Sequence, residues 1–160
     1  MEHKLTVLKL FLDALGIECN IKDVNDRKAM QKAVYIGQQL SGIDLGYRYG
    51  WYKLGPYCPS LTDDYYNLVR ALRVEKDAIA DKQLPTQISQ KLTKLKTIMS
   101  PPRGWHLAKE DWLELVASYH YLLHVRRKNH KEAVEILQAE KSRLASKVDL
   151  VLTALNTYST

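Results

Sequence analysis

One stretch of the chain, residues 27–72, constrains the fold more than any other part, because four local patterns follow one another in it. Its first pattern predicts a helix, since apolar residues recur at spacings of three and four. These residues are Met30, Ala33, Val34, Gly37 and Leu40. Asn25 and Asp26 predict the start of this helix. Ser41 and Gly42 predict its end, because glycine tolerates the left-handed conformation that often follows a helix.

The second pattern is an aromatic segment at residues 47–54, which predicts extended backbone because its side chains alternate between two faces. One face carries Tyr47, Tyr49 and Trp51, and the other carries Arg48, Tyr52 and Leu54. The segment is therefore expected to be a short strand, an extended arm or part of a small hairpin. Gly55 and Pro56 are expected to end it with a sharp turn, since proline keeps the preceding residue out of the helical region.

A second helix is expected after Pro59, which should delay its start. Ser60 or Thr62 predicts the cap, and Asp63 with Asp64 would lie in the first turn, where acidic groups suit the helix dipole. Its apolar face would be formed by Tyr65, Leu68, Val69 and Leu72. The two aspartates are interpreted as dipole partners rather than as a catalytic carboxylate pair, because adjacent helical residues point in different directions.

The order of these patterns resembles the Panacea domain, also called the SocA-like antitoxin domain, and the related YwgA-like proteins. The resemblance covers about residues 27–72, and nothing after about residue 74 matches. The residues that carry it are Gln31, Lys32, Tyr35, Gln38, Trp51, Tyr52, Gly55, Pro56, Ser60 and Leu61. An aromatic residue commonly precedes the Gly-Pro pair in that family, whereas Leu54 stands there in this chain.

The resemblance implies a non-enzymatic protein that binds a partner protein. In that family the partner would be a toxin or a defence effector, and the role that of an antitoxin or adaptor in bacterial toxin–antitoxin or phage-defence systems. Fold does not fix function, so the residues themselves must support this reading.

The remaining chain predicts further helices, so the expected fold class is mainly α. Helices are expected at residues 3–15, 86–99, 105–127 and 130–155, and the last of these ranges holds either two helices or one. The length of 160 residues favours a single compact helical domain of six or seven helices over residues 1–160.

Composition excludes several protein classes. Hydrophobic residues make up 46% of the chain, as in ordinary globular proteins. The sequence has no apolar run long enough for a membrane span, and its N-terminus lacks the uninterrupted apolar core of a signal peptide. A cytoplasmic protein without a membrane contact is therefore expected. Cys19 and Cys58 have no metal or redox spacing and are expected to be reduced thiols.

The net charge of +6 is concentrated in residues 82–109, which carry six basic and no acidic residues. The rest of the chain carries 18 residues of each sign. This basic stretch is either a solvated helix face or a surface for an acidic partner or nucleic acid. A second basic group follows residue 125, where a phosphate contact competes with simple support of a helix end. The candidate nucleic-acid contacts are Lys91, Lys94, Lys96, Arg103, Arg126, Arg127 and Lys128.

No motif predicts an enzyme, a cofactor or a metal. His120 and His124 have the spacing of two ligands on one helix, but no third ligand has diagnostic spacing, so packing or surface histidines are favoured. Cys58 with His106 or His120 would form a nucleophilic site only if the fold brought them together. The chain also lacks a glycine-rich loop of P-loop or Rossmann spacing.

The aromatic arm leaves two interpretations open: core packing and a partner-binding face. Tyr and Trp combine apolar area with a hydrogen-bonding tip, which is why they anchor interfaces. The candidate partner-binding residues are Tyr47, Tyr49, Trp51, Tyr52, Gly55, Pro56 and Tyr57. Among them Trp51, Tyr52 and Tyr57 are the expected anchors. The alternative function is a winged-helix-like regulator that lays the basic stretch along nucleic acid.

Overall fold

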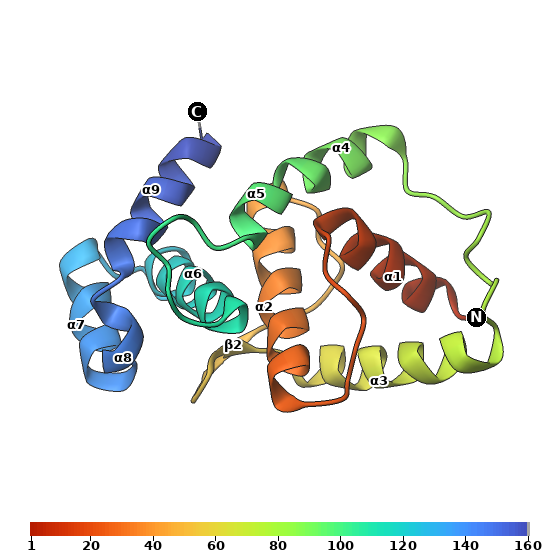
Figure 1. Cartoon of the computed structure of the whole chain (residues 1–160), viewed down its shortest axis with the longest axis horizontal. Helices are drawn as coiled ribbons and strands as arrows, with labels where there is room; N and C mark the ends of the chain where they lie inside the picture. Colours follow the sequence, from red (N-terminus) through yellow and green to blue (C-terminus); the bar gives the residue numbers. More distant parts are fainter. Residues whose placement is uncertain (160) are drawn as a thin grey trace.

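The computed structural model describes residues 1–159, so the last residue of the expected 1–160 domain lies outside it. Within this range the fold is mainly α, as predicted, with one small antiparallel hairpin (Figure 1). Seven helices have nine residues or more, and two further helical turns, α5 and α8, have four. No helix among the described residues has the length and apolarity to cross a membrane.

The elements follow one another in the order that Figure 1 labels. They are α1 (His3–Leu15), α2 (Val24–Ser41), β1 (Gly50–Tyr52), β2 (Gly55–Tyr57), α3 (Pro59–Val74), α4 (Thr86–Lys94), α5 (Lys96–Met99), α6 (Lys109–His124), α7 (His130–Glu140), α8 (Ser142–Ala145) and α9 (Val148–Ser159).

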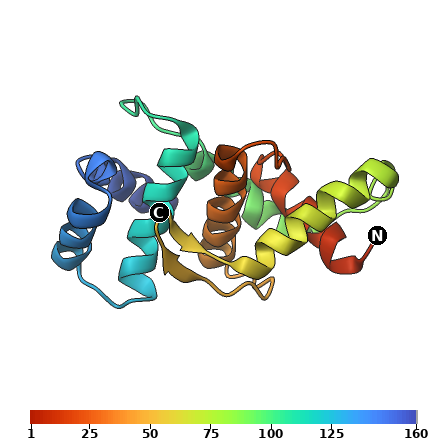
Figure 2. The same ribbon diagram turned by 90° about the horizontal axis from the view of Figure 1, so that it is seen from below.

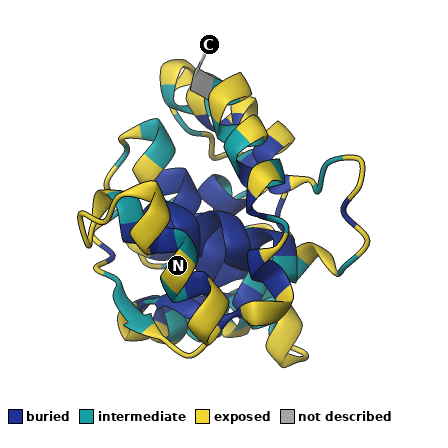
Figure 3. Cartoon of the chain, turned by 90° about the vertical axis from the view of Figure 1, so that its left-hand side faces the viewer, coloured by how far each residue is buried: buried dark blue, intermediate teal, exposed yellow. Residues whose placement is uncertain are grey.

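Two central helices, α2 and α6, carry most of the core. Residues 31–38 of α2 and 112–122 of α6 are buried without interruption, and the two helices pack on each other. Helices α1 and α3 cover one side of α2, while α7, α8 and α9 lie beyond α6 (Figure 1). Figure 3 shows the buried residues gathered at the centre of the molecule. A helix buried on all sides must place its polar groups inside the protein, and these groups build the site described below.

The helix ends agree with the sequence predictions in part. Gly42 ends α2 in the left-handed conformation, as expected, and Gly16 ends α1 in the same way. The predicted cap of α2 is wrong: the cap is Asp23, whose carboxylate accepts a hydrogen bond of 2.9 Å from the Asp26 amide. Asp26 does lie in the first turn, where it suits the helix dipole.

The prediction that Gly55 and Pro56 form the turn is wrong. The turn of the hairpin is Lys53-Leu54, and Gly55 pairs with Tyr52 while Pro56 pairs with Trp51. Strand β2 contacts both α2 and α6, so the Gly-Pro pair is buried in the fold (Figure 2). The signal was misread because glycine and proline mark turns, and here they mark a close approach of a strand to a helix.

The predicted start of α3 is also wrong. Pro59 does not delay the helix but is its first residue, and Cys58 is the N-cap. Proline suits this position because the first amide of a helix has no intrahelical acceptor. Neither Asp63 nor Asp64 lies in the first turn, so the prediction that they are dipole partners is wrong for both. Asp64 is buried and accepts a 2.8 Å hydrogen bond from the Tyr47 hydroxyl.

The C-terminal part begins with α4 and α5, which together bury Leu92, Leu95, Ile98 and Met99. Asn129 caps α7 with a complete capping box. The expected helix over residues 105–127 is shorter, because Trp105 lies in the loop before α6 and donates from its indole nitrogen to the Ala108 carbonyl at 2.9 Å. Two further predictions are wrong in their number of helices: α4 and α5 replace the one helix expected at 86–99, and α7, α8 and α9 replace the one or two expected after residue 130.

Gly55 provides a direct test of the close approach between β2 and α6. Its φ is +96°, and a Cβ added there would lie 2.5 Å from the Ser118 hydroxyl oxygen. We expect Gly55→Ala to lower the free energy of unfolding by about 2–4 kcal/mol, through backbone strain and overpacking, as measured by urea denaturation.

Two controls separate these two causes. Gly46 has a φ of +91° but no atom within 4 Å of the added Cβ, so Gly46→Ala should show the backbone part alone. Gly55→Ala in a Ser118→Ala background should recover the steric part. Equal losses for Gly46→Ala and Gly55→Ala would show that the contact with α6 contributes nothing.

Candidate functional site

A pocket of about 360 Å³ lies between the first two turns of α2, the tip of the hairpin and α3. It is therefore built from the same helix–arm–helix region that dominates the sequence. We call it the hairpin pocket. Its lining residues are Val24, Arg27, Lys28, Gln31, Lys32, Tyr52, Lys53, Leu54, Gly55, Tyr57, Thr62, Tyr65 and Tyr66.

The lining of the hairpin pocket includes a cluster of exposed apolar side chains. Val24, Tyr52 and Leu54 are 53%, 50% and 41% exposed. In the described part of the chain only two other large apolar residues are that exposed, Val74 and Val125, and neither lines this pocket. Single exposed apolar residues are common on proteins, but a cluster around a hollow is typical of an interaction site.

Lys32 lies in the wall of the hairpin pocket, although only 2% of its surface is exposed. Its Nζ donates a 2.7 Å hydrogen bond to the Pro56 carbonyl in β2. Burial lowers the pKa of this amine to about 7. The nearby Glu114 carboxylate raises the pKa in part, whereas Lys141 and Lys28 lower it further. A buried amine that titrates near neutrality is a feature more typical of functional sites than of plain structural lysines.

Beside Lys32 lies a buried network of charges that connects α2, α6 and the residue before α8. Glu114 of α6 forms ion pairs with Lys28 at 2.5 Å and with Lys141 at 2.7 Å. Lys28 also pairs with Asp111, which accepts two hydrogen bonds from Arg143. The hydrogen bonds from Arg143, with those from Lys28, lower the pKa of the Asp111 carboxyl to about 2. The Asp111 carboxylate is therefore ionised at neutral pH.

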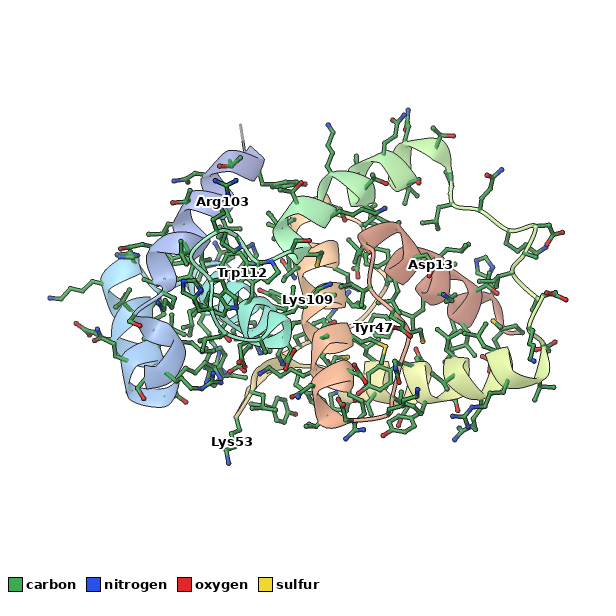
Figure 4. The ribbon with its side chains drawn as sticks, viewed as in Figure 1. Asp13, Tyr47, Lys53, Arg103, Lys109 and Trp112 are labelled. Carbon is green, nitrogen blue, oxygen red and sulfur yellow. The ribbon has the colours of Figure 1, made fainter. Side chains whose placement is uncertain are left out.

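The network also holds the hairpin tip. The Lys141 Nζ donates a 2.8 Å hydrogen bond to the carbonyl of Lys53, in the turn between β1 and β2. Figure 4 shows the Lys53 side chain at the tip, pointing away from the body of the protein. The hydrogen bond from Lys141 thus fixes the backbone of the turn, while the Lys53 side chain points outward and Leu54 stays exposed.

Two glutamines of α2 hold the chain on either side of the hairpin. Gln31 accepts from the Cys58 amide and donates to the Cys58 carbonyl, both at 2.9 Å. Gln38 accepts from the amides of Leu45 and Tyr47 and donates to the Tyr47 carbonyl. The two glutamine side chains supply hydrogen-bond partners to backbone groups that have none within the irregular segments.

The structure divides the predicted partner-binding residues into two groups. Tyr47, Gly55 and Pro56 are buried, and Tyr49 packs edge-on against Tyr35 with ring centroids 5.1 Å apart. Trp51 is half-buried and stacks on Tyr121 of α6. Tyr52 and Tyr57 line the hairpin pocket, with their ring centroids 5.1 Å apart. Of the three expected anchors, Tyr52 and Tyr57 therefore lie where a partner could reach them.

The predicted basic residues are not gathered on one site. Lys91, Lys94 and Lys96 are exposed on α4 and α5, and Arg103 lies in the loop before α6. The group at 126–128 follows α6, at the other end of a helix about 24 Å long (Figure 2). Arg126 lies over the ring of Tyr121, 5.7 Å from its centroid.

The remaining candidates do not form a catalytic or metal constellation. The rings of His120 and His124 stack 4.3 Å apart, and His120 Nδ1 shares a 2.9 Å hydrogen bond with the Tyr35 hydroxyl. Burial, with His124 beside it, lowers the pKa of His120 to about 4. No group of three metal-ligating side chains occurs within residues 1–159. Cys58 is buried, and its Sγ contacts the Ser60 hydroxyl.

Sequence reasoning missed the buried charges. Lys28, Glu114 and Lys141 are all buried, although lysine and glutamate on a helix normally indicate a solvated face. One signal was present: Glu114 stands inside the apolar run of residues 112–117, where a charge on a buried helix needs a partner.

Comparisons of this chain with protein-family models, with curated proteins and with solved structures find no match. The resemblance to the Panacea domain therefore stays a prediction.

Glu114 is the residue on which the charge network depends. We expect Glu114→Gln to lower the free energy of unfolding by about 3–5 kcal/mol, because it leaves Lys28 and Lys141 buried without their shared carboxylate. Denaturant unfolding at pH 7 measures this loss. The matched control is Asp13→Asn at the surface pair with Lys9, which should change stability by less than about 1 kcal/mol. Similar effects of the two variants would contradict the proposed importance of the network.

Trp51 tests whether the arm belongs to the core. Its ring centroid lies 5.7 Å from that of Tyr121, and its indole nitrogen donates to Glu140 at 3.2 Å. We expect Trp51→Ala to reduce stability by about 2 kcal/mol and to lower the melting temperature. Tyr52→Ala, in the same hairpin, should cost less than about 1 kcal/mol because Tyr52 is half exposed. An unchanged melting temperature for Trp51→Ala would assign Trp51 to an interface instead.

Proposed function

We propose that this chain is a non-enzymatic, cytoplasmic binding protein that holds a partner protein in the hairpin pocket. The role would be that of an antitoxin or adaptor in a bacterial toxin–antitoxin or phage-defence system, as the resemblance to the Panacea domain implies. The observation that carries the proposal is the clustering of Val24, Tyr52 and Leu54 around one pocket. No other grouping of exposed apolar side chains of this size is found within residues 1–159.

The rigidity of the pocket supports the same proposal. The hairpin tip is held by Lys141, and the segment after β2 is held by Gln31. A site that is already ordered loses little conformational entropy when a partner binds, so more of the contact energy contributes to affinity. The expected contact is small and centred on Tyr52, Leu54 and Tyr57, with the remaining contacts excluding water around them.

The test is a tagged pull-down from the native cell at moderate salt, with and without nuclease, read by mass spectrometry and by nucleic-acid staining. We expect one stoichiometric protein that survives nuclease treatment. The Tyr52→Ala, Leu54→Ser double variant should lose at least about 90% of this protein, because it removes two apolar contacts next to the pocket. Val74→Ser is the matched control, since Val74 is 84% exposed and lies outside the pocket.

Two outcomes would contradict this proposal. Equal capture by the double variant and by Val74→Ser would place the interface elsewhere. Recovery of nucleic acid alone, lost as salt rises, would favour the nucleic-acid-binding alternative. Charge reversal at Lys91, Lys94 and Lys96 would then be the next test.

A further inference from the structure

We infer that the hairpin pocket takes an acidic peptide segment of the partner, with an apolar side chain against Tyr52 and Leu54 and an Asp or Glu carboxylate on the Lys32 amine. This inference rests on the proposed function and names the chemistry that the same site would recognise.

The charge of the pocket lining favours an anionic occupant. Four of the 13 lining residues are basic, and none is acidic. Two of the four are already engaged: Lys28 pairs with Asp111 and Glu114, and Arg27 donates to the Ile21 carbonyl. Lys53 points away at the hairpin tip (Figure 4). Lys32 is therefore the one buried basic group of the pocket lining that forms no ion pair and keeps unused hydrogen-bonding capacity.

The hydrogen bonds of Lys32 show what that capacity is. Within residues 1–159 its amine makes one hydrogen bond, to the neutral Pro56 carbonyl, and no ion pair. A charged lysine amine has three N–H donors, so two remain for a ligand. A carboxylate can accept both, and in a site that excludes water such a charge-assisted bond is strong.

The charges around Lys32 leave its charged amine only partly stabilised, so an anion bound there would stabilise it further. Glu114 of α6 stabilises the charged amine, but Lys28 of α2 and Lys141 beside α8 share that carboxylate and oppose the charge. Burial, together with these opposing charges, holds the pKa of Lys32 at about 7 in the free protein. A bound carboxylate would raise this pKa, so binding above pH 7 must take up a proton.

The apolar part of the pocket explains why the occupant is a peptide rather than a small anion. Tyr52 and Leu54 extend the apolar surface outward along the hairpin tip, where a free phosphate would gain nothing. An extended segment with an apolar residue next to Asp or Glu places one group on each surface. The chemistry of the pocket thus matches an apolar–acidic sequence.

The first measurement is selection of a random 12-residue peptide library displayed on phage against the unmodified protein. We expect enrichment of peptides that carry Trp, Phe or Leu within two positions of Asp or Glu. The selected peptide is then synthesised with its acidic residue and with the matching amide, and both are titrated by calorimetry. The amide form should bind about 30-fold more weakly or worse, because the buried amine loses its charged partner.

Variants assign the effect to Lys32. Lys32→Gln should weaken the acidic peptide about 30-fold or more and leave the amide peptide almost unchanged, so the two losses should not add. Lys91→Gln removes the same charge from an exposed site outside the pocket and is the matched control. Lys32→Met is the second variant, in case Lys32→Gln fails to fold.

The unmodified protein offers an independent readout. At pH 8 about 0.9 of a proton should be taken up per acidic peptide bound, as measured in two buffers of different ionisation enthalpy, because the free amine has a pKa of about 7. The affinity for the acidic peptide should be near its maximum at pH 6 and about tenfold weaker at pH 8. The amide peptide should show neither effect.

Each contrary outcome has a separate meaning. Peptides without acidic enrichment, or acidic peptides that bind Lys32→Gln normally without proton uptake, would overturn this inference. Such peptides could still need Tyr52 and Leu54, in which case the proposed function would stand. Peptides that bind the Tyr52→Ala, Leu54→Ser variant as tightly as the unmodified protein would overturn the proposed function as well.

Discussion

The Glu114 carboxylate is the contact on which the rest of the structure depends. It pairs with Lys28 of α2 and Lys141 beside α8, and Lys141 in turn fixes the Lys53 carbonyl at the hairpin tip. One buried carboxylate on α6 therefore connects α2, the segment before α8 and, through Lys141, the hairpin. An apolar residue would pack here with less desolvation, so the charge is better explained by the specific geometry it imposes than by stability alone.

The hairpin itself follows from a backbone requirement. Three-residue strands form little structure by themselves, and the segments before and after them have irregular backbone that still needs hydrogen-bond partners. Gln31 and Gln38 supply these partners from α2, and Lys32 supplies one for Pro56 between them. These three polar residues lie in the part of α2 that is buried without interruption. Their side chains attach the hairpin and its flanking segments to α2, so no larger sheet is needed.

The sequence predicted the elements well where the signal is local. Periodic apolar residues and the end of α2 at Gly42 depend on neighbours within one helix, and they were read correctly. Gly55 and Pro56 were misread because their role depends on Ser118, which is distant in sequence. Two of the predicted partner-binding tyrosines line the hairpin pocket, whereas the buried charges beside the pocket were not predicted. Tyr52 and Tyr57 follow from composition, whereas the partners of Lys28 and Lys32 depend on how α2 meets α6.

The misread positions and the unusual chemistry lie in the same place. Lys32 is a buried amine with a neutral acceptor, Gly55 adopts a conformation that other residues resist, and Tyr52 and Leu54 remain exposed. Each feature is unfavourable for a chain that only needs to fold, and all three meet at the hairpin pocket. Local rules are broken most often where a protein binds something, because function selects features that folding alone would remove. The concentration of these features around the pocket is therefore a physical reason to test the pocket for binding.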